Sequence, residues 1–417
     1  MGGLTNVAGT MNIQSERLWR RLEDMARIGA TSLGGCNRQA LSDLDHQGRV
    51  LFERWAAEAG CEVRRDAIGN IFARRPGTLT DAAPVMSGSH LDTQPTGGKY
   101  DGVYGVLAAL EAVETLNDHQ IDTARPIDIV VWTNEEGSRF DCAMMGSAVW
   151  SGAMTLDAAL NLADLDGVTV REELVRLNLA GEAPFGTPVH AAFELHIEQG
   201  PILEAEGQPV GVVTGVQNMC RYRLRYAGQE THAGPSPMSM RRDPMKGAST
   251  FISSVYALAE GTGPDARATF GYIHATPGSP NTVPGSVELT LDLRHPDAAV
   301  YARFQAEAES LAATAARQGH LSLEIDRVWE APGVTFDRRC VAHVRQAVEH
   351  LGFSAFDMVS GAGHDACNLA SVAPTSMIFI PCRDGLSHNE AEHISQHQAA
   401  DGANVLLHAI AAAANET

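Results

Sequence analysis

Four short apolar segments of the chain each run towards a loop that carries His, Asp or Glu. These segments are residues 83–86, 127–132, 192–195 and 376–380. Apolar runs of this length predict strands that are buried on both faces of a sheet. Helix-like stretches, such as 103–117 and 398–413, accompany them. Strands joined by helices are typical of an α/β fold with a mostly parallel sheet.

The loops after these segments place chemically reactive side chains at the ends of the predicted strands. In chain order, these residues are His90, Asp92, Glu135, Glu136, His196 and His388. Ligands of parallel α/β sheets gather outside the carboxyl ends of the strands. We therefore expect these side chains to converge on one point.

The stretch from residue 213 to residue 330 has a different pattern. Residues 221–226 alternate between polar and apolar, which predicts a strand with one buried face. The elements expected after it are a helix over 244–259, strands over 269–275 and 286–294, a helix over 297–318 and a strand over 321–328. This β-α-β-β-α-β order is that of a ferredoxin-like unit. We predict an inserted α+β domain at 213–330, which splits a catalytic domain made of 1–212 and 331–417.

The length, charge and cysteine content of the chain limit the kinds of protein to which it can belong. With 417 residues it exceeds the ~250 to 300 residues at which single hydrophobic cores stop growing, so two domains are expected. A formal net charge of −20 at pH 7 disfavours binding to nucleic acid or to an anionic membrane surface. Seven cysteines without a CxxC pair indicate neither a disulfide framework nor a thiolate zinc site. The first residues lack the pattern of a signal peptide, so we expect a soluble cytoplasmic protein.

Asp101 lies in a glycine-rich loop that can turn its carboxylate towards the predicted strand ends. Two cations about 3.5 to 4 Å apart need a bridging carboxylate together with further His and carboxylate ligands. Asp92 follows His90 by two residues, so we expect its carboxylate to accept the second imidazole N–H and fix the tautomer. Oxygen and imidazole ligands suit zinc, manganese, cobalt or nickel. The sequence therefore predicts a site for two divalent metal ions.

Glu135 and Glu136 are adjacent, and neighbours on an irregular loop point in different directions. One can bind metal while the other takes a proton from the attacking water and returns it to the leaving nitrogen. Each feature alone has a simpler explanation. A single His is usually structural, a Glu pair is usually solvated, and an Asp among glycines usually belongs to a turn. The metal site is favoured because all of these features occur together at strand exits.

Longer motifs are spread along nearly the whole chain. They are GSHLDT (88–93), GGKYDG (97–102), TNEEG (133–137), ELHIEQG (194–200), THAGPSPM (231–238), NTVPG (281–285), DLR (292–294), SGAGHDA (360–366) and DGLSHNEAE (384–392). Together they resemble the hydantoinase/carbamoylase amidases, a family of N-carbamoyl-L-amino-acid hydrolases, beta-ureidopropionases and allantoate amidohydrolases. The combination is far more specific than any single motif.

The resemblance implies a role for each site residue. One metal ion would be held by His90, Asp101 and His196. A second ion would be held by Asp101, Glu136 and His388, so that Asp101 is the bridge. Glu135 would be the catalytic base. The substrate would be bound by Gln199, His232, Asn281, Arg294 and the backbone of Gly363, and the roles of His364 and Asp365 stay open.

The resemblance also implies that the inserted domain is a lid and dimerisation domain. The chain would form a homodimer in which His232 completes the partner's site and donates to the developing oxyanion. Arg294 lies on the polar face of its predicted strand, where its guanidinium can clamp a substrate carboxylate with two hydrogen bonds. Without the motif, a salt bridge to Asp292 would be the favoured explanation of Arg294.

The expected reaction is hydrolysis of an N-carbamoyl amino or β-amino acid to the free amine, carbon dioxide and ammonia. The partner is thus a small ureido substrate that carries a carboxylate. An allantoate amidohydrolase is the alternative within the same chemistry, and an aminopeptidase is a more distant one. A non-catalytic binding protein would lack a metal ligand or the base, whereas this sequence has all of them.

Overall fold

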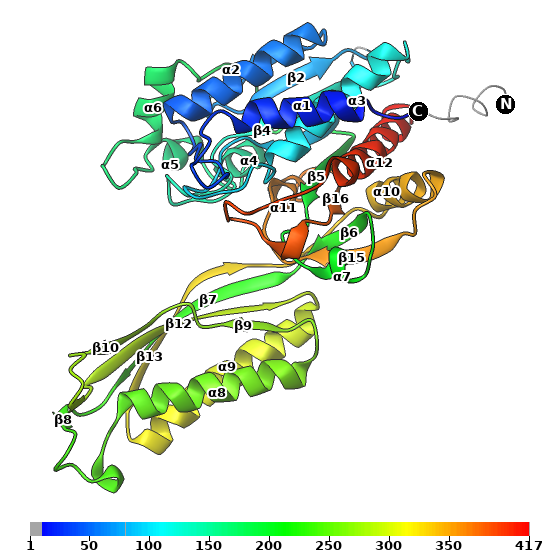
Figure 1. Cartoon of the computed structure of the whole chain (residues 1–417). Helices are drawn as coiled ribbons and strands as arrows, with labels where there is room; N and C mark the ends of the chain where they lie inside the picture. The colour runs from blue at the N-terminus through cyan, green and yellow to red at the C-terminus, as the bar shows by residue number, and fades with distance from the viewer. Residues whose placement is uncertain (1–10, 80, 417) are drawn as a thin grey trace. The chain divides into compact units, whose positions relative to one another are not determined.

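The structure is a computed structural model that describes residues 11–79 and 81–416 (Figure 1). The chain divides into two compact units. The first unit combines the chain up to Gly215 with the chain from Thr335 onward, and the second unit is Val216–Val334. We expected the divisions a few residues earlier, after residues 212 and 330.

The first unit is built on a sheet of nine strands, counted over the described residues (Figure 1). They are β1 Glu62–Arg65, β2 Ile71–Arg75, β3 Val85–His90, β4 Ile127–Trp132, β5 Ala191–Ile197, β6 Gly211–Val216, β14 Val334–Thr335, β15 Phe356–Ser360 and β16 Thr375–Ile380. Their order is β1-β2-β4-β3-β5-β16-β6-β14, and β15 pairs with β6. The central strands β4, β3, β5 and β16 are parallel to one another. β1 is antiparallel to β2, β2 is antiparallel to β4, and β6 is antiparallel to β16. The prediction of an α/β fold with a mainly parallel central sheet is confirmed.

Helices cover both faces of this sheet. One face packs against α1 Ser15–Ala26, α2 Asp43–Glu58, α3 Val103–Asp118, α10 Arg338–His350 and α12 Gln396–Ala414. The other face packs against α4 Met145–Ser151 and α11 Asp365–Leu369. Successive strand residues point to opposite faces, so Ile129 enters the first layer and Val130 the second. The remaining short helices are α5 Leu156–Leu160, α6 Val170–Leu177, α7 Ile202–Ala205 and η2 Arg383–Gly385.

Two strands are longer at their carboxyl ends than the apolar pattern predicts. We expected strands over 83–86 and 192–195, but β3 continues to His90 and β5 continues to Ile197. The hydroxyl of Ser89 donates a hydrogen bond of 2.7 Å to Glu194 on the neighbouring strand. Because these polar side chains satisfy each other inside the sheet, polar residues extend both strands. His90 and His196 therefore belong to the ends of rigid strands.

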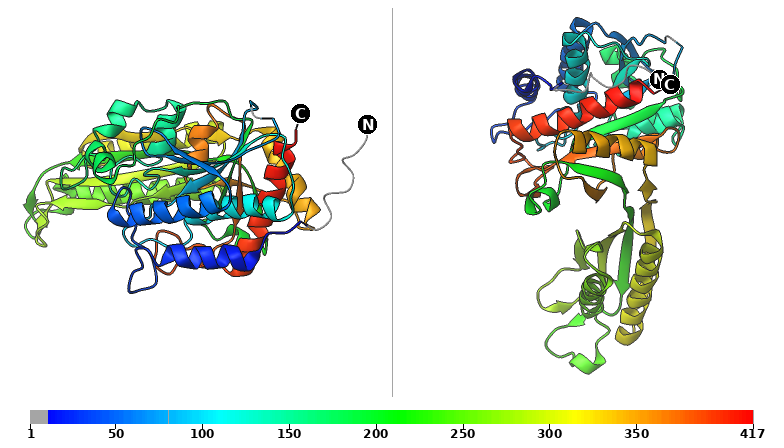
Figure 2. Two further views of the ribbon diagram at one scale, coloured as in Figure 1. Left: turned by 90° about the horizontal axis from the view of Figure 1, so that it is seen from above. Right: turned by 90° about the vertical axis from the view of Figure 1, so that its right-hand side faces the viewer.

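The second unit is an antiparallel sheet with helices packed on one of its faces (Figures 1 and 2). Its elements are β7 Asn218–Ala227, α8 Pro244–Thr262, β9 Arg267–Thr269, β10 Ile273–Thr276, β12 Ser286–His295, α9 Ala298–Gly319 and β13 Ser322–Ala331. The strand order is β10-β12-β7-β13, and β9 also pairs with β12. The predicted strand over 269–275 is thus two strands, both paired with β12. A separate pair is formed by β8 Thr231–His232 and β11 Thr282–Val283, and η1 is Met238–Met240.

The alternation along β7 explains how this unit holds together. Tyr222, Leu224 and Tyr226 are buried against α8 and α9, whereas Arg221 and Arg223 point to the exposed face. An amphipathic strand of this kind covers a core with one face and meets water with the other. None of the helices in the described part of the chain is long and apolar enough to cross a membrane.

Candidate metal centre

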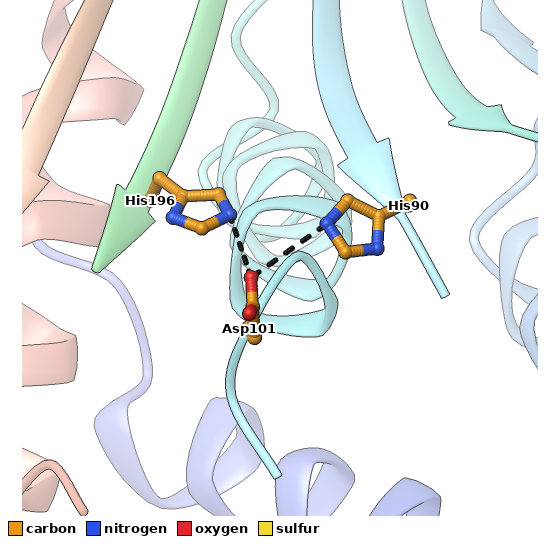
Figure 3. Close-up of side chains that lie close together, drawn as sticks. All are labelled: His90, Asp101 and His196. Atoms are coloured by element: carbon orange, nitrogen blue, oxygen red, sulfur yellow. Dashed lines mark ion pairs between the residues drawn. The ribbon is translucent and has the colours of Figure 1, made fainter. Parts of the chain in front are cut away.

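Two histidines at adjacent strand ends point at one carboxylate (Figure 3). His90 ends β3 and His196 lies near the end of β5, and these strands are parallel neighbours. Nε2 of His90 lies 3.7 Å from Oδ1 of Asp101, and Nε2 of His196 lies 3.1 Å from the same oxygen. Asp101 comes from the loop before α3. The strand ends and this loop therefore create the first group of candidate ligands.

The second oxygen of Asp101 faces a second group. Nε2 of His388 lies 3.3 Å from Oδ2 of Asp101 and 3.2 Å from Oε2 of Glu136. The carboxylate of Asp101 thus contacts one group through Oδ1 and the other through Oδ2. The candidate ligand atoms of each group lie within 4.8 Å of one another. Imidazole and carboxylate donors in this arrangement fit divalent transition metals, and Asp101 has the geometry of a bridging ligand.

Backbone carbonyls orient the two strand-end histidines. Nδ1 of His90 lies 2.9 Å from the carbonyl oxygen of Asp92, and Nδ1 of His196 lies 2.9 Å from the carbonyl oxygen of Ile197. These contacts place the imidazole proton on Nδ1 and leave Nε2 for a metal ion. The expectation that the carboxylate of Asp92 accepts from His90 is wrong, because Nδ1 lies 3.9 Å from Oδ1 of Asp92.

The carboxylate of Asp92 instead holds the loop of the two glutamates. Its oxygens accept the backbone N–H of Glu135 at 3.3 Å and that of Glu136 at 3.2 Å. The preceding residue, Asn134, has a φ of 54°, a left-handed conformation that turns the chain sharply after β4. As a result the two glutamates diverge. Oε2 of Glu135 lies 3.5 Å from Nε2 of His90, whereas Glu136 lies beside His388.

The charges of the site interact strongly. Burial acts to raise the pKa of Asp101, but hydrogen bonds to His196 and His388 outweigh it and hold that pKa well below its usual range. The hydrogen bonds to Asp101 and Glu136 raise the pKa of His388 to about 10. Burial, followed by the repulsion of Asp365 and Glu136, raises the pKa of Glu135 well above its usual range. These buried carboxylates attract positive charge, as a cation site requires.

Gln199 and Gly363 also lie in the first unit. Nε2 of Gln199 donates to Oδ2 of Asp101 at 2.9 Å. Gly363 immediately precedes His364, whose ring lies edge-on to the ring of His196 with the centroids 4.6 Å apart. His364 is buried, and its Nε2 lies 3.1 Å from the hydroxyl of Ser360. Asp365 is buried next to it and accepts a hydrogen bond from Ser147.

The other three expected substrate residues belong to the second unit. His232 on β8 pairs with Thr282 on β11, and Asn281 precedes that partner. Nδ1 of His232 accepts the N–H of Gly234 at 3.0 Å, so a neutral ring carries its proton on Nε2. Arg294 on β12 makes two hydrogen bonds to Asp292, of 2.7 and 3.2 Å. The salt bridge that we considered as the alternative for Arg294 is therefore present.

Two residues near the candidate ligands were not singled out by the sequence. Glu392 is buried, and Ser387 lies between it and Asp101. Both belong to the motif at 384–392, in which the family resemblance implies a role for His388 alone. The spacing of four residues between His388 and Glu392 was the available signal, but glutamates in a loop rich in charge are usually solvated.

Comparison with known proteins shows the family of the chain. The sequence profile of Peptidase family M20/M25/M40 matches residues 86–412. The chain belongs to this family. The crystal structure of an amidase of the hydantoinase/carbamoylase family from Burkholderia multivorans has a TM-score of 0.95 and 51% identity, and the match covers 98% of this chain and 100% of that one. The resemblance to the hydantoinase/carbamoylase amidases is thereby confirmed.

Several curated relatives carry the name of an activity. An N-carbamoyl-L-amino-acid amidohydrolase from Rhizobium meliloti is 46% identical over 95% of this chain and 96% of its own length. An N-carbamoyl-L-amino acid amidohydrolase from Geobacillus stearothermophilus is 38% identical over 95% of this chain and 98% of its own length. The allantoate amidohydrolase of Escherichia coli is 34% identical over 92% of this chain and 94% of its own length.

Proposed function

We propose that this chain is a metal-dependent amidohydrolase that cleaves the ureido group of an N-carbamoyl amino or β-amino acid. Water is consumed, and the products are the free amine, carbon dioxide and ammonia. The observation that carries the proposal is the position of Asp101, whose two carboxylate oxygens face two separate groups of metal-binding side chains. The identity of 46% to an N-carbamoyl-L-amino-acid amidohydrolase supports the choice of substrate class.

Five residues would hold the metal ions. His90 and His196 would bind one ion together with Asp101, and Glu136 and His388 would bind the other together with Asp101. Zinc, manganese, cobalt and nickel all fit this set of nitrogen and oxygen donors. When bound, such ions lower the pKa of a water molecule and polarise the ureido carbonyl.

Glu135 would move the proton. It is buried at the edge of the first group, and none of its hydrogen bonds in the described residues ties its carboxylate to a structural role. Its raised pKa suits a carboxylate that accepts a proton from the attacking water and then passes it to the leaving nitrogen. The transfer requires a group that can hold the proton between the two steps, and Glu135 provides it.

The residues of the second unit would recognise the substrate. Arg294, with Asn281, would bind the substrate carboxylate, and Arg294 would exchange its contact with Asp292 for this ligand. His232 would donate from Nε2 to the oxyanion that forms on the ureido carbon. We further propose that the second unit is a lid and dimerisation domain and that His232 acts on the site of the partner subunit in a C2 homodimer. Gln199 and the backbone of Gly363 would complete the substrate contacts.

A substrate panel tests the proposal. Purified protein would be stripped with a chelator, reconstituted separately with zinc, manganese, cobalt and nickel, and assayed for release of ammonia and free amine. We expect no turnover after stripping, recovery with at least one metal, and fastest turnover of N-carbamoyl-L-amino acids. Turnover of a preparation that elemental analysis shows to be free of metal would contradict the proposal.

Allantoate amidohydrolase is the second candidate, because relatives with that name are 32% and 34% identical to this chain. Allantoate in the same panel distinguishes the two, since it presents ureido groups beside a carboxylate. Release of amino acids from dipeptides would indicate an aminopeptidase. Metal binding without turnover of any panel member would favour a binding protein.

A further inference from the structure

A buried glutamate joins the two loops that carry Asp101 and His388. Glu392 lies between η2 and α12 and is 4% exposed. Its Oε1 accepts the backbone N–H of Tyr100 at 2.9 Å and that of Asp101 at 3.1 Å. One carboxylate oxygen therefore fixes the main chain of the residue that lies between the two ligand groups.

The glycine-rich loop is shaped for this contact. A Cβ added to Gly98 would lie 2.0 Å from Cδ and from Oε1 of Glu392. A side chain at this position would push the carboxylate of Glu392 aside, whereas glycine lets the main chain cross the face of the carboxylate. Gly98 therefore serves the approach of Glu392.

The other oxygen of Glu392 reaches the loop of His388. The hydroxyl of Ser387 lies 2.9 Å from Oε2 of Glu392 and 3.2 Å from Oδ2 of Asp101. The next residue, His388, has a φ of 53°, and its Nε2 lies 3.3 Å from the same oxygen of Asp101. Glu392 and Ser387 thus fix both the direction of the Asp101 carboxylate and the turn that presents His388.

The first ligand group is held by different means. His90 and His196 extend from β3 and β5, and backbone carbonyls of Asp92 and Ile197 fix their rings. Among the described residues, neither histidine forms a hydrogen bond with Glu392. A change at Glu392 should therefore affect the group of Asp101, Glu136 and His388 more than the group of His90, Asp101 and His196.

We propose that Glu392 is a positioning residue that sets the geometry of the group formed by Asp101, Glu136 and His388. The inference rests on the proposed function, because it assumes that this group binds a divalent ion. Loss of a side chain that orients metal ligands typically lowers metal affinity about 10- to 100-fold. We expect a loss of that size for one metal-binding event and a much smaller change for the other.

Manganese binding measures the two events separately. Chelator-treated full-length protein would be titrated with Mn²⁺ alone, and free Mn²⁺ would be followed by electron paramagnetic resonance. In Glu392→Ala we expect one binding event to weaken ~10- to 100-fold. Glu392→Gln should retain most of the affinity, since its amide oxygen can still accept the two backbone N–H groups.

Glu390→Ala is the matched control, because Glu390 belongs to the same segment but accepts its side-chain hydrogen bond from Thr31. It should keep both binding events. The thermal midpoint of the metal-free protein would be measured for each variant, and the rise of that midpoint on addition of Mn²⁺ should be reduced only in Glu392→Ala. A merely structural role would lower the metal-free midpoint without a selective loss of one binding event.

Unchanged Mn²⁺ binding in Glu392→Ala would overturn the inference, and so would an equal weakening of both events. If that variant does not fold, Ser387→Ala removes only the hydroxyl that links the two carboxylates, and the same selective loss is expected. Wild-type binding in a folded Ser387→Ala protein would then refute the link. Failure of the wild-type chain to bind any divalent ion would instead refute the proposed function itself.

Discussion

Gly102 lies directly against the ring of His90. A Cβ added to Gly102 would lie 2.3 Å from Nε2 of His90, the nitrogen that faces Asp101. Gly102 also has a φ of 67°, a conformation that residues with a side chain rarely adopt. Gly102, the residue after Asp101, thus limits the space available to His90, which comes from the end of β3.

This contact predicts that Gly102→Ala displaces His90. We expect metal affinity to fall by ~10-fold or more, with activity falling alongside, because the ring can no longer reach its position. The matched control is Gly152→Ala, which has the same sign of φ, at 84°, but no atom within 4 Å of the added Cβ. The control carries backbone strain of roughly 1 to 3 kcal/mol and should keep its metal. Similar metal loss in both variants would refute the steric explanation.

The divergence of the two adjacent glutamates predicts different phenotypes. Glu135→Gln should keep its metal content and lose ~10²- to 10⁴-fold in kcat, since proton transfer is removed and no ligand is lost. Glu136→Gln should lose metal, because Glu136 lies beside His388. Elemental analysis and steady-state kinetics on the same preparations make the comparison. The opposite pattern would exchange the roles of base and ligand.

The guanidinium of Arg294 predicts a substrate-binding defect. Arg294→Lys should raise KM for N-carbamoyl amino acids ~10-fold or more, since an ammonium group cannot reproduce a planar two-point contact. Arg223→Lys is the control, because Arg223 lies on the exposed face of the same sheet near Glu288. Unchanged kinetics in Arg294→Lys would place this residue outside the substrate site. Its salt bridge to Asp292 would then be its only assigned role.

The proposed role of His232 predicts complementation between inactive chains. Glu135→Gln and His232→Ala chains would be produced together, each nearly inactive alone. If His232 acts on the partner's site, a mixed dimer has one site with both defects and one with neither. Random pairing then restores roughly a quarter of wild-type activity. Activity that stays at the level of the separate variants would show that His232 acts within its own chain.

The strands could be predicted where their sequences are apolar. The strand expected over 127–132 has those bounds, because every residue of β4 is buried and most are apolar. The apolar pattern predicts too short a β3, because Ser87 and Ser89 are polar and polar residues after an apolar run usually indicate a loop. The partner of Ser89 is Glu194, 105 residues away, and no local pattern reveals such a contact.

The candidate ligands could be proposed from motifs, but the residues that orient them could not. Asp92 was recognised, yet its carboxylate binds the backbone of the Glu135 loop, and its carbonyl contacts His90. Glu392 accepts backbone N–H groups from residues 291 and 292 positions earlier. Long-range hydrogen bonds to the main chain leave no mark in the spacing of residue types, so their partners become visible only once the chain is folded.

The place of β16 between β5 and β6 has a consequence for synthesis on the ribosome. A nascent chain that ends before Thr375 already carries β3 and β5 but lacks β16, the second neighbour of β5, and it also lacks His388. Such a chain would expose the backbone edge of β5, which invites aggregation. Prematurely terminated chains are therefore expected to be degraded. They should not accumulate as chains that keep only one group of candidate metal ligands and compete for metal in the cell.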